Sequence, residues 1–190
     1  MVIHHAAMSD YKGSAYFPTK IIIDEVSKAV EPGLEVAGLD GRFCSMENQD
    51  ELNEYCTKVP VTTMDEHFAD IIKQRQLIHV LKVDSEGWDY PILFRGGLNV
   101  LRLTEYLEFE YHHDGAWQNY TLQSAIDQLD GMGFTCYWAG KSQLWRITGC
   151  WFDHYGYKYW SNVACAHRRL APALENHMEH IFEQTIAQAN

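Results

Sequence analysis

Apolar residues along the chain fall into short continuous runs that alternate with stretches of three-to-four spacing, and this pattern predicts a mixture of strands and helices. Strands are expected at residues 2–7, 14–17, 60–63, 77–83, 106–111, 134–138 and 160–166. Helices are expected at residues 47–55, 63–72, 90–101, 121–132 and 170–188. Because strands and helices alternate over much of the chain, the pattern predicts an α/β sheet.

Local signals sharpen some of these boundaries. Thr63 is a good N-cap, with Glu66 three positions later as a capping-box partner. Thr121 is the corresponding cap of a later helix, and Gly133 is expected to end that helix. The strand at 77–83 has no clean polar alternation, which is typical of a strand covered on both faces in a parallel sheet.

The length of 190 residues fits a single domain, with residues 18–58 as a variable insertion or loop region and 170–188 as a C-terminal amphipathic helix. With 26 acidic against 15 basic side chains, the net charge of -11 argues against a nucleic-acid or anionic-membrane partner. No apolar stretch is long enough to predict a membrane segment. No targeting signal is visible, so a cytoplasmic location is the default, and nothing indicates the oligomeric state.

The five cysteines form no CxxC pair and are odd in number. This usage argues against a zinc knuckle and against a complete disulfide framework. Reduced and mostly buried thiols are therefore expected.

Acidic residues lie where two predicted strands end. Asp84 and Glu86 follow the strand at 77–83, and Glu110 lies at the end of the strand at 106–111. Ligands of α/β sheets bind outside the carboxyl ends of the strands, and neighbouring strands are about 4.8 Å apart. Asp84 and Glu110 could therefore share a proton or bind one Mg²⁺ ion, and Glu86 could join them. Hydrogen bonding to the backbone amides of the turn is the structural alternative.

Aromatic and histidine side chains add further candidates. His112 follows Glu110 closely and could act as a general base, although an exposed polar loop is equally compatible with this position. The aromatic run at 150–160 contains Trp151, Tyr155 and Trp160, which could line an acceptor pocket or cover the core.

The acidic stretch also resembles a known family. The segment 77–101, LIHVLKVDSEGWDYPILFRGGLNVL, is similar to the signature of FkbM-type S-adenosylmethionine-dependent methyltransferases, in which an apolar strand ends in Lys-x-Asp-x-Glu-Gly. The matching positions here are Lys82, Asp84, Glu86, Gly87, Asp89, Leu93 and Gly96. Weaker resemblance extends to VPVTTMDEHFAD, YLEFEYH, AAMSDYKGSAYF and WSNVACAHR.

The resemblance implies a Rossmann-like class I methyltransferase sheet with helices on both faces. It implies O-methylation of a small-molecule or glycan hydroxyl, with S-adenosylmethionine as cofactor and Mg²⁺ as a possible second one. The residues assigned on this basis are Asp84, Glu110 and His112 for catalysis, Ala7, Met8 and Ser9 for the cofactor, Glu86, Trp88, Trp151 and Tyr155 for the substrate, and Asp84 and Glu110 for the metal.

The chain also departs from the family pattern. The resemblance places the glycine-rich donor loop and the ribose-binding acid upstream of residue 1, so the sheet is expected to lack its first two strands and the chain to be part of a longer protein. The internal segment 34–45, LEVAGLDGRFCS, is expected to be an ordinary loop. A noncatalytic α/β interaction domain, truncated or degenerate relative to a methyltransferase, is the alternative function.

Overall fold

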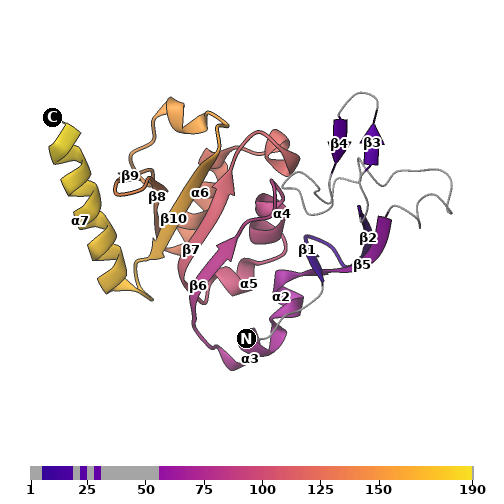
Figure 1. Ribbon diagram of the computed structural model, residues 1–190. Coiled ribbons are helices and arrows are strands. Elements are labelled where there is room, and N and C mark those ends of the chain that lie inside the picture. Colours follow the sequence, from indigo (N-terminus) through magenta and orange to yellow (C-terminus); the bar gives the residue numbers. More distant parts are fainter. Residues whose placement is uncertain (1–5, 19–21, 25–27, 31–55, 190) are drawn as a thin grey trace.

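The computed structural model describes residues 6–18, 22–24, 28–30 and 56–189, which form a mixed α/β structure (Figure 1). The helix predicted at 47–55 and the loop at 34–45 lie outside these residues. The described strands and α-helices belong to a five-stranded sheet with its helices, a three-stranded sheet, and a hairpin of β3 (Ile22–Asp24) and β4 (Lys28–Val30).

The five-stranded sheet has the order β6-β7-β10-β8-β9. Its strands are β6 (Ile78–Val83), β7 (Thr104–Tyr111), β8 (Phe134–Ala139), β9 (Leu144–Arg146) and β10 (Ser161–His167). β6 and β7 are parallel, with Val83 opposite Phe109, whereas β10 is antiparallel to both β7 and β8. The carboxyl ends of β6 and β7 therefore meet at one edge of the sheet.

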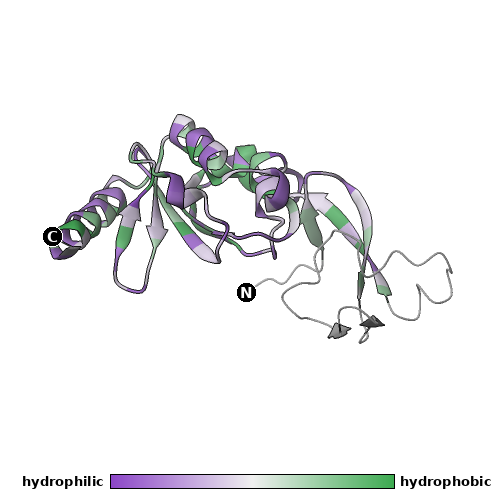
Figure 2. Ribbon diagram, turned by 90° about the horizontal axis from the view of Figure 1, so that it is seen from above, coloured by the Kyte–Doolittle hydropathy of each residue, from purple (hydrophilic) through white to green (hydrophobic). Residues whose placement is uncertain are grey.

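Helices cover both faces of this sheet (Figure 2). Val163 and Cys165 of β10 belong to the main core, which also contains residues of α6 (Leu122–Met132). The alternate residues Ala164 and Ala166 pack with Met178 of α7 (Pro172–Ala189). Because successive side chains of a strand point to opposite faces, α6 and α7 lie on opposite sides of the sheet.

The predicted helix boundaries are confirmed where the capping residues decide them. The Thr63 hydroxyl accepts a hydrogen bond from the Glu66 amide at 3.2 Å, and the Thr121 hydroxyl accepts one from the Ser124 amide at 3.2 Å. Gly133 ends α6 with a φ of 100°. The helix expected at 63–72 is instead two helices, α2 (Met64–His67) and α3 (Ala69–Gln74).

The expectation that the strand at 77–83 is covered on both faces is wrong. β6 is an edge strand of its sheet, and Val80 is 67% exposed. β1 (Ala7–Ser9) does not join this sheet; it pairs with β5 (Cys56–Thr63) in the three-stranded sheet β1-β5-β2, whose third strand is β2 (Gly13–Pro18). No strand within the described ranges covers the free edge of β6.

Two short helices connect β6 to β7 and link the two sheets. They are α4 (Asp89–Phe94) and α5 (Leu98–Leu101). The Asp65 carboxylate of α2 accepts hydrogen bonds from the backbone amides of Asn99 at 3.0 Å and Val100 at 2.9 Å. Asp65 thus caps α5 from another element and fixes α2 beside the main sheet.

The expectation that the cysteines are reduced is wrong for Cys56, Cys136 and Cys165, each of which is disulfide-bonded. Cys136 of β8 and Cys165 of β10 form a disulfide across two neighbouring strands. Odd cysteine number and missing CxxC spacing cannot exclude such a bond, because strand pairing brings together residues that are far apart in the sequence.

Candidate functional site

The turn after β6 has a backbone that favours glycine. Glu86 and Gly87 have φ values of 52° and 89°, in the left-handed region. A Cβ atom at Gly87 would lie 2.4 Å from the backbone oxygen of Asp114, and the Ala116 amide donates to the Gly87 oxygen at 2.9 Å. The loop after β6 therefore packs directly against the loop after β7, and a side chain at position 87 would separate them.

This turn brings three carboxylates together. Asp84, Glu86 and Glu110 each offer one oxygen, and these atoms lie within 4.8 Å of one another. Asp84 also pairs with Lys82, whose Nζ lies 3.3 Å from its Oδ2, and this hydrogen bond raises the pKa of Lys82. Carboxylate oxygens at this separation can hold one hard cation, although the Lys82 ammonium already offsets part of the negative charge of Asp84.

Asp89 connects the turn after β6 to the end of β7. Its side chain is fully buried, and it accepts hydrogen bonds from the Ser85 hydroxyl at 3.1 Å and from the Glu110 amide at 3.3 Å. Burial raises the pKa of Asp89 to about 7. Sequence reasoning placed Asp89 in the motif but missed this positioning role. An acid surrounded by apolar positions at the start of a short helix is the signal that could have found it.

His112 is buried beside the carboxylates, so the exposed-loop alternative for this residue is wrong. Its ring stacks on Trp160 with centroids 4.2 Å apart and planes at 1°, and its Nδ1 accepts from the Asp114 amide at 3.2 Å. Among the described residues its buried Nε2 has no hydrogen-bond partner. Burial lowers the pKa of His112, which favours the neutral ring; because Nδ1 accepts a hydrogen bond, the proton of that ring is on Nε2.

Trp160 joins His112 to the acidic cluster. Its indole Nε1–H donates to Oε2 of Glu110 at 3.2 Å while its ring covers the imidazole. Trp151 and Tyr155, from the same aromatic run, lie elsewhere. Tyr155 is buried and packs edge-on against Trp138 at 5.1 Å and against Trp151 at 6.0 Å. The aromatic run therefore has two roles: Tyr155 covers the core, whereas Trp160 borders the carboxylate cluster.

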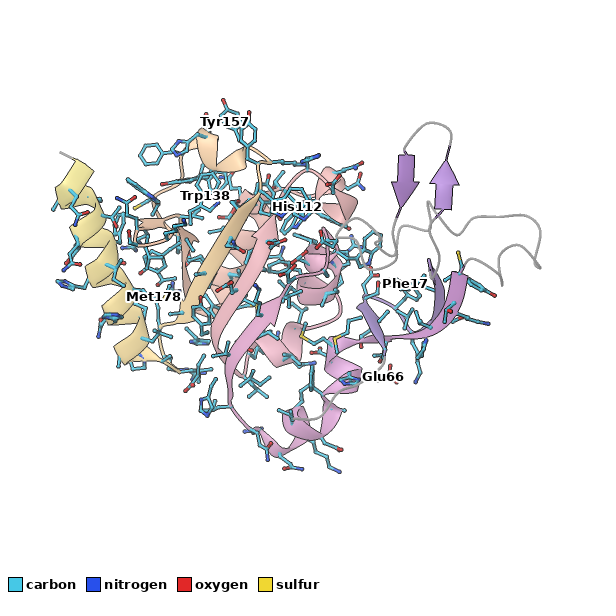
Figure 3. The ribbon with its side chains drawn as sticks, in the orientation of Figure 1. Phe17, Glu66, His112, Trp138, Tyr157 and Met178 are labelled. Carbon is cyan, nitrogen blue, oxygen red and sulfur yellow. A yellow bond between two sulfur atoms is a disulfide. The ribbon has the colours of Figure 1, made fainter. Side chains whose placement is uncertain are left out.

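Asp84 also lines a cavity of about 430 Å³. Its lining is mostly apolar and comes from both sheets and α2, including Ala7, Met8, Phe17, Met64, Phe68, Val83 and Trp88, and its polar residues are Lys82, Asp84, Ser85 and Glu86. Phe17, labelled in Figure 3, lies on β2 of the three-stranded sheet. Of the predicted cofactor residues, Ala7 and Met8 line this cavity, whereas the buried Ser9 accepts a hydrogen bond from the Trp88 indole at 3.0 Å.

Comparison with protein families shows which family the chain belongs to. The family model described as the methyltransferase FkbM domain matches residues 23–136, which include both strand ends and the turn between them. The chain belongs to the FkbM methyltransferase family. No curated protein and no solved structure matches it. In this FkbM chain, no helix among the described residues has the length and apolar content to cross a membrane.

Proposed function

We propose that the chain forms the acceptor side of an S-adenosylmethionine-dependent O-methyltransferase. The observation that carries the proposal is the convergence of Asp84, Glu86 and Glu110 at the carboxyl ends of two parallel strands, beside a buried histidine. The parallel β6–β7 pair, with helices on both faces of the sheet, supports a Rossmann-like class I arrangement.

Transfer of a methyl group to a hydroxyl oxygen requires that the oxygen lose its proton and approach the methyl carbon in line. Asp84 is exposed enough to meet an acceptor and can take the hydroxyl proton. His112 is buried and its Nδ1 accepts from the Asp114 amide, so its Nε2 carries the proton of the neutral ring and would act as a donor rather than as the base. Asp89 and Trp160 would hold the Glu110 end of the cluster in place through their hydrogen bonds.

The carboxylate cluster fits a magnesium ion in its donor set. Three acidic oxygens within 4.8 Å of one another repel, and the single Lys82 ammonium beside Asp84 offsets part of this repulsion; a bound cation would offset more. Mg²⁺ prefers such hard oxygen ligands and usually retains several waters. Bound there by Asp84, Glu86 and Glu110, it would lower the pKa of a nearby acceptor hydroxyl.

The cavity fits the methyl donor in size. Its volume of about 430 Å³ lies in the range of small-molecule sites. A sulfonium is a cation, which Glu86 and aromatic faces such as Phe68 and Trp88 would favour, while the Lys82 ammonium that also lines the cavity is paired with Asp84. S-adenosylmethionine would supply the activated methyl group, with Ala7 and Met8 among the residues that line its site.

Calorimetric titration of the full chain with Mg²⁺ tests the cluster directly. We expect saturable binding by the wild-type protein and a loss of at least about tenfold in affinity in Glu110→Gln, because one of three charged ligands is removed. Glu183→Gln on α7 changes the net charge equally but lies outside the cluster, so it should bind as the wild type does.

Equal Mg²⁺ affinity in all three proteins would contradict the metal role and leave the carboxylates as bases. If S-adenosylmethionine also neither bound nor donated a methyl group, the noncatalytic interaction domain would be the better description.

A further inference from the structure

Exposed aromatic side chains gather on the loop that precedes β10. We call this group the aromatic rim; it consists of Phe152, Tyr157, Tyr159 and Trp160. Tyr159 is 76% exposed and Trp160 is 49% exposed. Among the described residues, only Tyr11 is a further exposed large aromatic. Several large rings exposed together usually mark a binding surface rather than ordinary surface composition.

The rim is held on a supported loop. Tyr155 is buried beneath it against Trp138, and the Tyr111 hydroxyl donates to the Gly156 oxygen at 3.0 Å. The Lys158 ammonium donates to the Trp117 oxygen at 2.5 Å. Figure 3 shows Tyr157 at the outer end of this loop, with Trp138 and His112 below it. The exposed rings therefore project from an anchored backbone.

Trp160 connects the rim to the carboxylate cluster. It stacks one face on His112 and donates its indole N–H to Glu110, and it directly follows Tyr159, whose ring centroid lies 6.3 Å from that of Tyr157. A ligand lying on the rim would have flat apolar surfaces beneath it and carboxylate oxygens at one end.

This chemistry selects among the ligand classes. A nucleic acid or another polyanion would be repelled by Glu110 and by a chain of net charge -11. The ammonium of Lys158, which lies between Tyr157 and Tyr159 in the sequence, already donates to backbone oxygens. An anionic membrane surface is disfavoured for the same reason. A neutral sugar fits, because its C–H face can pack on aromatic rings while its hydroxyl groups donate to carboxylates.

We propose that the aromatic rim is an acceptor subsite for a neutral carbohydrate, with a sugar ring packed on Tyr157, Tyr159 and Trp160 and a hydroxyl directed toward Glu110. This inference rests on the proposed methyltransferase function and names the substrate class of the same site. The transfer it implies forms a C–O bond to the sugar oxygen, breaks the S–C bond of the donor, releases the neutral thioether, and passes the hydroxyl proton to Asp84.

Binding of the full chain to an array of immobilised glycans, followed by calorimetry with the strongest neutral glycan, tests the proposal without requiring catalysis. The wild-type protein should retain neutral glycans in preference to sialylated or sulfated ones. The double variant Tyr157→Ala/Tyr159→Ala should lose about tenfold or more in affinity, because two stacking rings are removed. Tyr11→Ala, which removes an exposed ring on the turn between β1 and β2, should bind like the wild type.

The proposal is overturned if no neutral glycan is retained, if the rim variant binds as well as the wild type, or if the rim instead binds vesicles of phosphatidylcholine and phosphatidylserine. Its failure is separable from that of the methyltransferase function. Glycan binding without any methyl transfer would remove the enzymatic role and leave the subsite, whereas methyl transfer to a noncarbohydrate hydroxyl would do the reverse.

Discussion

At the scale of single residues, the site depends on side chains that hydrogen-bond to Glu110 but are not themselves members of the carboxylate cluster. Trp160 covers the His112 ring and donates a hydrogen bond to the Glu110 carboxylate, and the Asp89 carboxylate accepts a hydrogen bond from the Glu110 backbone amide. Each acts by holding a neighbouring residue in place, so each is a positioning residue whose substitution should change a measurable property of the site.

The His112–Trp160 stack gives the first test. In Trp160→Ala the imidazole becomes exposed to water, and its pKa should rise toward its ordinary value because burial is the main cause of its lowering. NMR titration of the His112 ring protons measures this shift. Trp160→Phe retains a covering ring and should leave the pKa close to that of the wild type. An unchanged pKa in Trp160→Ala would show that the stack does not shield His112.

Asp89 gives the second test through the pH dependence of stability. Its pKa of about 7 in the folded protein exceeds the ordinary value of 3.8, so the folded state favours the protonated acid. The resulting stabilisation is complete below pH about 4 and is lost as the pH rises through about 7; it amounts to at most about 4 kcal/mol.

Asp89→Asn should remove this contribution. Urea unfolding between pH 4 and 8 should therefore give the variant a smaller decrease in the free energy of unfolding with rising pH than the wild type. Parallel profiles for the two proteins would contradict the raised pKa.

At the scale of elements, the close contact between the loops after β6 and β7 keeps the two strand ends in register. Gly87→Ala should destabilise the protein by roughly 2 kcal/mol or more, since the new Cβ meets the Asp114 oxygen and the φ of 89° is unfavourable for alanine. Gly131→Ala is the matched control. No atom lies within 4 Å of its Cβ position in α6, so it should stabilise the helix by about 0.5–1 kcal/mol. Urea denaturation distinguishes the two, and equal effects would contradict the loop contact.

Much of the second half of the fold could be predicted from the sequence, because capping residues and apolar spacing act locally. Thr63, Thr121 and Gly133 mark helix ends that the structure confirms. β9 was missed because it is three residues long and its burial is only partial. The exposure of Val80 was missed because an apolar run in a single sequence does not reveal whether a neighbouring strand is present.

The site could be predicted only in part for the same physical reason. Acids at the ends of consecutive strands follow from sequence order, and the structure brings Asp84, Glu86 and Glu110 together. The buried Asp89 bridge and the coplanar His112–Trp160 stack depend on tertiary packing between segments far apart in the chain. No local pattern specifies such contacts.

At the scale of the whole molecule, the carboxylate cluster lies between two different surfaces. The apolar cavity that includes Met8 lies on the β6 side of Asp84, and the aromatic rim lies on the side of β10. This division suits a reaction with two substrates that meet at the strand ends. Donor and acceptor could then approach Asp84 from separate directions.

Methyl transfer from radiolabelled S-adenosylmethionine by the full-length protein and its Asp84→Asn variant is the most direct test of this arrangement. Asp84→Asn preserves the size of the side chain but removes its charge, so we expect turnover to fall by roughly 100-fold or more while the urea-unfolding midpoint stays close to that of the wild type. Turnover equal to that of the wild type in a folded Asp84→Asn variant would contradict the role assigned to the strand-end carboxylates.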